Sequence, residues 1–264
     1  MAHHQFESGS ARHCEVGVTV GFSLHDFSAV FQIRNEEGMP YILIGGQAVN
    51  YWAERYEPID PDLLSLRPFT SQDIDFKGNR ADVQRIANQL NLFPTYPRKV
   101  EMTSLAGSIS FQIGALKSNI EIVRSIPGIP TPATPAIEAE WEGKSIRVLD
   151  PISLLACKLE LARTVSQENR QDLNHLRILV PCVRGFLGEL LQQVEAGNLP
   201  PRDWLKVANQ VLKLTTNLGA RRITSQHHIH WLEILPQAAI AKSQNAKIRR
   251  FRENLLQRSK GSSF

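Results

Sequence analysis

A short apolar run followed by two glycines constrains the fold more than any other stretch of the chain. Residues 42–44 are Ile-Leu-Ile, and Gly45 and Gly46 follow directly. The apolar run predicts a buried strand, and apolar residues three or four apart predict a helix from Gln47 to Tyr56. A helix that begins at such a turn presents unpaired backbone N–H groups and the positive end of its dipole. The turn could therefore bind a phosphate, or it could be a tight strand-to-helix turn without a ligand.

Two aspartates lie two positions apart in a second predicted strand, Asp73 to Phe76. Because side chains alternate along a strand, Asp73 and Asp75 should point to the same face. Glu121 is the nearby acid with apolar residues on both sides, in a predicted strand at 120–122. Mg²⁺ prefers oxygen ligands and is commonly held by one or two carboxylates together with substrate phosphates. The three acids together therefore predict a site for Mg²⁺ or Mn²⁺, although each alone could belong to an exposed strand face.

Several basic residues could bind phosphate beside these acids. The candidates are Lys77, Arg80, Lys117 and Lys158. Asp150 can cap a helix that begins at Pro151, and this helix would carry Lys158. The alternative for Lys158 is a solvated lysine on an amphipathic helix.

Two other groups of residues could suggest chemistry but do not support it. His227, His228 and His230 invite a metal interpretation, but no carboxylate or cysteine lies at ligand spacing. Cys157 and Cys182 have no local base that would activate a thiolate, so they are interpreted as small core residues.

The periodicity of the chain changes at residue 150. Residues 23–150 alternate between predicted strands and helices, whereas residues 151–264 show only helical periodicity. Residues 1–22 have no usable period and contain Gly, Ser and paired His, so they are predicted to form a mobile N-terminal arm. The chain is therefore predicted to be α+β, with a mixed β-sheet flanked by helices over 23–150 and a helical C-terminal domain over 151–264.

The individual elements follow from the same patterns. Besides those named above, predicted strands cover residues 99–102, 108–113 and 145–148. Predicted helices cover residues 27–33, 82–90, 151–162, 171–180, 186–196, 202–215 and 232–256, the last broken by Pro236. Residues 57–67 are interrupted by prolines and are predicted to form a long loop.

Composition limits the compartment and the class of partner. No apolar run approaches the ~20 residues needed to span a bilayer, and the first residues lack the apolar segment of a secretory signal. The three cysteines are too few and too widely spaced for a disulfide framework. A cytoplasmic protein without a membrane partner is expected. The net charge of +4, with basic residues concentrated late in the chain, is compatible with a polyanion such as tRNA, although a solvated helix face is the commoner explanation.

The glycine turn, the aspartate pair and Glu121 in this order resemble the DNA polymerase beta-like nucleotidyltransferase superfamily. The segments concerned are 45–48 (Gly-Gly-Gln-Ala), 73–76 (Asp-Ile-Asp-Phe) and Glu121. Residues 148–158 and 170–176 are similar to the bacterial branch related to abortive-infection nucleotidyltransferase toxins. The likeness covers about residues 24–180.

This resemblance implies a two-metal site on Asp73, Asp75 and Glu121. Gly45 and Gly46 would contact the triphosphate of an NTP, and Lys77 and Lys158 would lie near the nucleotide, with Lys158 projecting from the cleft side of its helix. Gln47 stands where the family commonly has a Ser or Thr that touches a phosphate oxygen, and it can still donate a hydrogen bond. The family's usual interval between the glycines and the first aspartate is shorter, and its third acid is more often Asp.

The implied function is metal-dependent transfer of NMP from an NTP to a hydroxyl acceptor, with Glu121 as a candidate to activate the hydroxyl. The acceptor would be an RNA such as tRNA, or a protein, and the chain could be the toxin of a toxin–antitoxin pair with an antitoxin protein as its partner. Two alternatives stay open. One is a catalytically inactive nucleotidyltransferase fold that serves as a binding module. The other is a small-molecule (antibiotic) nucleotidyltransferase.

Overall fold

The structure is a computed structural model that describes residues 21–130 and 134–261, with side chains described up to residue 257. The predicted arm at 1–22 therefore lies outside the described residues, except for its last two. One of these, Phe22, is buried and forms an antiparallel bridge with Ser71. The chain is thus already packed on the fold at Phe22. Its bridge partner Ser71 lies two residues before Asp73.

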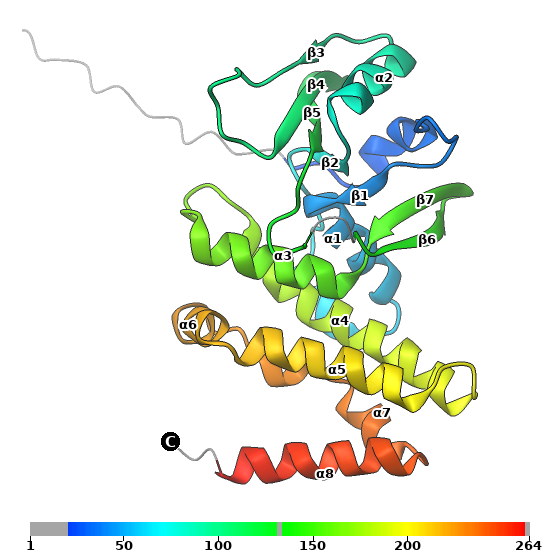
Figure 1. The fold of residues 1–264 in the computed structure, drawn as a ribbon, viewed down its shortest axis with the longest axis vertical. Coiled ribbons are helices and arrows are strands. Elements are labelled where there is room, and N and C mark those ends of the chain that lie inside the picture. The colour runs from blue at the N-terminus through cyan, green and yellow to red at the C-terminus, as the bar shows by residue number, and fades with distance from the viewer. Residues whose placement is uncertain (1–20, 131–133, 262–264) are drawn as a thin grey trace, which may run out of the picture.

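A seven-stranded mixed sheet forms the upper half of the molecule in Figure 1, with strand order β3-β4-β5-β2-β1-β7-β6. The strands are β1 (Ile42–Ile44), β2 (Ile74–Lys77), β3 (Pro94–Thr95), β4 (Leu105–Ile113), β5 (Leu116–Val123), β6 (Ala136–Trp141) and β7 (Lys144–Leu149). β2 pairs antiparallel with β1 and parallel with β5, and β1 pairs parallel with β7. This arrangement confirms the predicted α+β class.

Two helices flank the sheet. α1 (Gly45–Tyr56) packs on β1 and β2, and α2 (Arg80–Leu90) packs on β3, β4 and β5. A capping box between Asn79 and Asp82 begins α2, two residues before the start of the helix predicted at 82–90. A 3-10 helix, His25–Gln32, occupies the first predicted helical segment.

The remaining helices form the lower half of the molecule (Figure 1). They are α3 (Pro151–Thr164), α4 (Asp172–Glu195), α5 (Pro201–Thr216), α6 (Leu218–His227), α7 (Gln237–Lys242) and α8 (Ala246–Gly261), with a short 3-10 helix at Trp231–Ile234. Asp150 caps α3 through the backbone N–H groups of Ile152 and Ser153. No described helix combines the length and apolar character that crossing a membrane requires.

The two halves share one continuous hydrophobic core. α3 and α4 pack against each other and against α1. Trp52 of α1 illustrates the contact, because its ring lies 6.0 Å from that of Phe186 in α4 and its indole N–H donates to the Leu149 carbonyl at 2.9 Å. The division of the chain at residues 150 and 151 stays a prediction.

The strand prediction at 99–102 is wrong. Val100 and Met102 alternate with charged residues, but both are exposed, so no face of the segment packs on the core. The sheet instead contains the short β3 before this segment and the edge strand β6, neither of which was predicted. β6 alternates only half-buried and exposed residues, which leaves a weak pattern in the sequence.

The predicted helices at 171–180 and 186–196 are one helix, α4, with Pro181 in its interior. Proline removes a helical hydrogen bond, and here the burial of this segment outweighs that cost. α6 was not predicted, and the broken helix at 232–256 is divided among the 3-10 turn, α7 and α8.

The predicted loop at 57–67 contains a 3-10 helix, Pro61–Leu66, and is tied to α4. Asp60, which caps this 3-10 helix, accepts hydrogen bonds from two nitrogens of Arg184, both at 2.7 Å. This partly buried ion pair anchors the long insertion between the glycines and the aspartates, so the insertion is compatible with an ordered β2.

Candidate functional site

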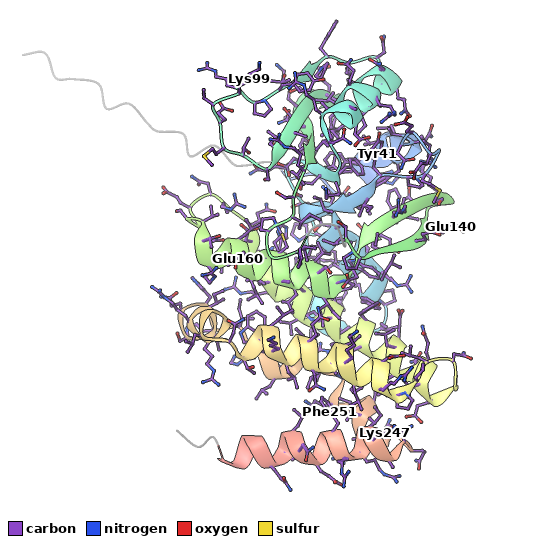
Figure 2. All side chains as sticks on the ribbon, viewed as in Figure 1. Tyr41, Lys99, Glu140, Glu160, Lys247 and Phe251 are labelled. Carbon is purple, nitrogen blue, oxygen red and sulfur yellow. The ribbon has the colours of Figure 1, made fainter. Side chains whose placement is uncertain are left out.

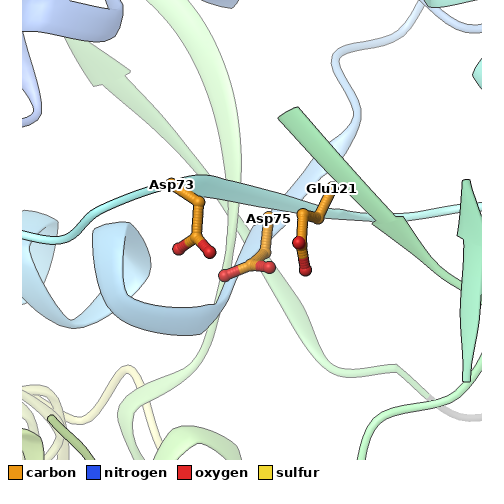
Figure 3. Close-up of side chains that lie close together, drawn as sticks. All are labelled: Asp73, Asp75 and Glu121. Atoms are coloured by element: carbon orange, nitrogen blue, oxygen red, sulfur yellow. The ribbon is translucent and has the colours of Figure 1, made fainter. Parts of the chain in front are cut away.

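The sheet brings the three predicted acids together (Figure 3). Asp75 of β2 is in direct register with Glu121 of the neighbouring parallel strand β5, and Asp73 lies just before β2 on the same face. Ile74 and Phe76 alternate with the aspartates and are buried on the opposite face. One carboxylate oxygen from each acid lies within 4.8 Å of the others, a spacing suited to a shared divalent cation.

The acids line a cleft of about 290 Å³ between the sheet and the helical half of the molecule. Gly45 and Gly46 lie beside them at the beginning of α1. Across the cleft, α3 contributes Lys158 and the segment that leads into α4 contributes Arg170. A helix N-terminus and two cations thus face three carboxylates across a space large enough for part of a nucleotide.

Both glycines are required by the close approach of α1 to the acids. Gly45 has φ +67°, and a Cβ at this position would lie 1.8 Å from Oδ2 of Asp75. A Cβ at Gly46 would lie 2.4 Å from Oγ of Ser71. The nearby backbone of Gly46 lowers the pKa of Asp75, an effect smaller than that of burial. Asp75 and Ser71 therefore leave no room for a side chain at either position of this turn.

The clustered acids repel one another. Burial, followed by the charges of Asp73 and Glu121, raises the pKa of Asp75 well above its ordinary value. Although the Asp75 side chain opens to the cleft, the surrounding walls displace most of the water that would solvate its charge. Burial likewise raises the pKa of Asp73 and of Glu121, and the charge of Asp73 adds to the shift at Glu121. A site that favours protonated carboxylates in the absence of a cation is suited to binding one.

Lys158 is buried in an ion pair rather than solvated. Its Nζ lies 2.8 Å from Oδ1 of Asp172, and Nε of Arg170 lies 2.6 Å from Oδ2 of the same carboxylate. Burial alone would raise the pKa of Asp172, but the two cations outweigh it and hold the pKa below its ordinary value. The three groups carry a net charge of +1, so this wall of the cleft can attract phosphate oxygens while Asp172 holds Lys158 in place.

Two residues predicted to bind the nucleotide do not line the cleft. Gln47 is fully buried, where its amide nitrogen donates to the Phe22 carbonyl at 2.9 Å and its oxygen accepts from Asn50. The Nζ of Lys77 donates to the carbonyl of Arg124. Both side chains are therefore engaged elsewhere, and neither lies in the cleft lining.

The other candidate positions also lie away from the cleft. The guanidinium of Arg80 lies 3.8 Å above the ring of Tyr96, and Lys117 is exposed on β5. Among the described residues, no cluster with metal-ligand spacing includes a histidine. Cys157 lines the cleft, but burial raises its pKa to about 11, so its thiol stays protonated at neutral pH.

Several polar residues of the cleft were not assigned a role from the sequence, among them Ser71, Arg170, Asp172 and His175. Ser71 precedes Asp73 by two positions, and its alternation with the aspartates was an available signal. Arg170 lies in the segment that carries the family resemblance. His175 follows Asp172 by three residues on α4, which places both on one face of the helix. This spacing would have indicated His175 only if Asp172 had already been predicted as a cleft residue.

Comparisons with known proteins add little to this geometry. No protein-family model and no curated protein matches the chain. Among solved structures, an antigenic nucleotidyltransferase-like protein from Paracoccidioides brasiliensis matches with a TM-score of 0.37 and 11% sequence identity, covering 53% of this chain and 67% of that chain. A likeness of this strength says nothing about activity, so the function has to be argued from the site.

The burial of the three acids, together with repulsion at Asp75 and Glu121, predicts a pH-dependent effect of Mg²⁺ on stability. The folded-state pKa values of Asp73, Asp75 and Glu121 are raised, so between the unfolded and folded pKa values the native state binds more protons than the unfolded state. Their contribution to stability therefore falls as pH rises through this window, beginning near 4. We expect Mg²⁺ to raise the melting temperature more at about pH 8 than at about pH 5, because at low pH protons compete with the cation.

Differential scanning fluorimetry with Mg²⁺ and with EDTA at each pH measures this difference directly. Because other groups titrate in the same range, the Mg²⁺-dependent increment is the informative quantity and not the melting temperature itself. An increment that is equal at both pH values would contradict a cation site on these acids.

Proposed function

We propose that the protein is a nucleotidyltransferase that depends on a divalent cation, Mg²⁺ or Mn²⁺, and transfers NMP from an NTP to a hydroxyl acceptor. The observation that carries this proposal is the set of three carboxylates within 4.8 Å of one another, directly in front of the glycine N-terminus of α1. Chemistry of this kind needs a held triphosphate and divalent cations more than it needs a covalent intermediate.

Each part of the cleft has a role in such a reaction. Asp73, Asp75 and Glu121 would hold the cation, which when bound neutralises phosphate charge and activates the attacking oxygen. The N–H groups at the start of α1 and the ammonium of Lys158 would bind and orient the phosphates. Glu121 is also the candidate to accept the proton of the acceptor hydroxyl.

An RNA such as tRNA is the acceptor that we favour. α8 carries Lys247, Arg249, Arg250 and Arg252 and only one acid, Glu253, among its described side chains. Figure 2 shows Lys247 at the lower end of the molecule, below the half that contains the sheet and Tyr41. An acceptor that contacts both the cleft and α8 has to be large and polyanionic, which supports RNA over a small-molecule drug.

A protein acceptor and a toxin role with an antitoxin partner remain parts of the proposal. They rest on the sequence resemblance of residues 148–158 and 170–176. A binding module without activity would have no need for three repelling acids in one cleft, which favours the enzyme.

The proposal is tested by incubating the protein with each labelled NTP, Mg²⁺ or Mn²⁺, and total RNA or cell lysate. The double variant Asp73→Asn/Asp75→Asn is the negative control, and Glu140→Gln, an exposed acid on β6, is the matched control (Figure 2). We expect label in RNA with the wild type and with Glu140→Gln, and none with the double variant. If no acceptor is labelled and no metal-dependent NTP binding is found, the enzyme assignment is wrong.

A further inference from the structure

His175 is a buried polar residue without a hydrogen-bond partner. It lies on α4, its residue is 4% exposed, and neither ring nitrogen has a partner among the described residues. Buried polar groups in proteins are almost always paired, because an unpaired donor loses its hydration without compensation. His175 also lines the cleft, so a ligand bound there could supply the missing partner.

The ring lies directly against the beginning of α1. Its Cε1 atom would be 3.0 Å from a Cβ at Gly46, and Oγ of Ser71 would be 2.4 Å from the same point. Gln47, the next side chain of α1, is turned away and bonded to Phe22. Besides the Asp73 and Asp75 carboxylates, the polar groups at this end of the helix are its backbone N–H groups, the His175 ring and the Ser71 hydroxyl, which lies 3.4 Å from Oδ1 of Asp73.

The ring is neutral in this environment. Burial and the nearby cations Lys158 and Arg170 hold the pKa of His175 well below its ordinary value, although Asp172 opposes them. A neutral imidazole carries one N–H donor and one acceptor nitrogen. With a divalent cation held by Asp73, Asp75 and Glu121, their negative charge would be neutralised. Beside a helix N-terminus, a hydroxyl and two cations, the ligand group that the surroundings then favour is an anion.

We propose that His175 is a substrate-binding residue that donates its ring N–H to a phosphate oxygen of the NTP, at the N-terminus of α1. This inference rests on the proposed function. It assigns His175 to the polyphosphate and not to the base or ribose, and it explains why a buried, unpaired histidine is retained in the wall of the cleft.

The assignment predicts opposite effects on stability and on binding. His175→Phe keeps a ring of similar shape and removes two unpaired buried nitrogens, so the melting temperature of the free protein should stay unchanged or rise. The same change removes the donor, so affinity for Mg²⁺-tripolyphosphate should fall about 10- to 100-fold. His175→Asn and His175→Gln place an amide N–H near the position of one ring nitrogen or the other, and one of them should restore most of the affinity.

The experiment is isothermal titration calorimetry of full-length variants with inorganic tripolyphosphate and with each NTP, in Mg²⁺, together with thermal unfolding of each free variant. His230→Phe, at an exposed histidine before the Trp231–Ile234 turn, is the matched control and should leave the affinity unchanged. An equal loss for tripolyphosphate and for the preferred NTP supports contact with the polyphosphate.

Four results would overturn the inference. The first is a His175→Phe variant that binds as tightly as the wild type, and the second is a loss confined to the NTP. The third is evidence that the ring serves packing. Such evidence would be a His175→Phe variant that melts at a lower temperature or fails to fold, or an equal loss of affinity in all three His175 variants. The fourth is a wild type that binds neither tripolyphosphate nor any NTP, which would remove the proposed function as well; the first three leave that function intact.

Discussion

Substituting Asp75 by asparagine is expected to reduce nucleotide transfer by roughly a thousandfold, the scale of losing several kcal/mol of metal-assisted stabilisation. The same substitution should raise the melting temperature of the metal-free protein. Asp75 is the acid whose pKa is most strongly raised by burial and by its neighbours, so a neutral side chain of equal size relieves repulsion from Asp73 and Glu121. Loss of activity together with a gain in stability distinguishes a cation-binding acid from a structural one.

Initial rates of transfer to the labelled acceptor and thermal unfolding in EDTA measure the two effects. Glu140→Gln serves again as the matched control, because it removes an exposed acid outside the cleft. A variant that loses stability in EDTA, or one that keeps wild-type activity, would show that Asp75 does not belong to a cation site.

Substituting Gly45 by alanine is expected to disable the site by steric contact. An alanine at φ +67° costs about 1–2 kcal/mol in backbone strain. Its Cβ would lie 1.8 Å from Oδ2 of Asp75, and the resulting overpacking should cost a further ~1–3 kcal/mol. Because Asp75 has to move, transfer should fall by about a hundredfold.

Gly114→Ala separates the two causes. Gly114 has φ +59°, similar to Gly45, but no atom lies within 4 Å of a Cβ built there. This variant should show the backbone strain alone, with little change in activity. Chemical denaturation and transfer rates of both variants give the comparison, and equal behaviour of the two would mean that the contact with Asp75 is unimportant.

The strand, turn and helix around Gly45 and Gly46 were predictable because their signals are local. Apolar runs and period-two alternation are properties of a few adjacent residues, and they suffice to place Asp73 and Asp75 on one face. Glu121 was found by the same alternation, and the parallel pairing of β2 with β5 brings it into register with Asp75. Local signals failed where an element was weakly patterned, as in β6, or where alternation occurred without burial, as at residues 99–102.

The opposite wall of the cleft could not be predicted in this way. The family resemblance implied Lys158, but Asp172 and His175 were not assigned a role from the sequence. Helical periodicity indicates which face of α4 is apolar but not which distant segment that face meets. The side chain of Gln47 turns away because Phe22 offers it a carbonyl, a contact between residues on separate segments. The acids and the glycine turn are thus encoded by short-range patterns in the sequence. The cations and the buried histidine reach them only through packing of α3 and α4 on α1, because such long-range contacts depend on the whole core.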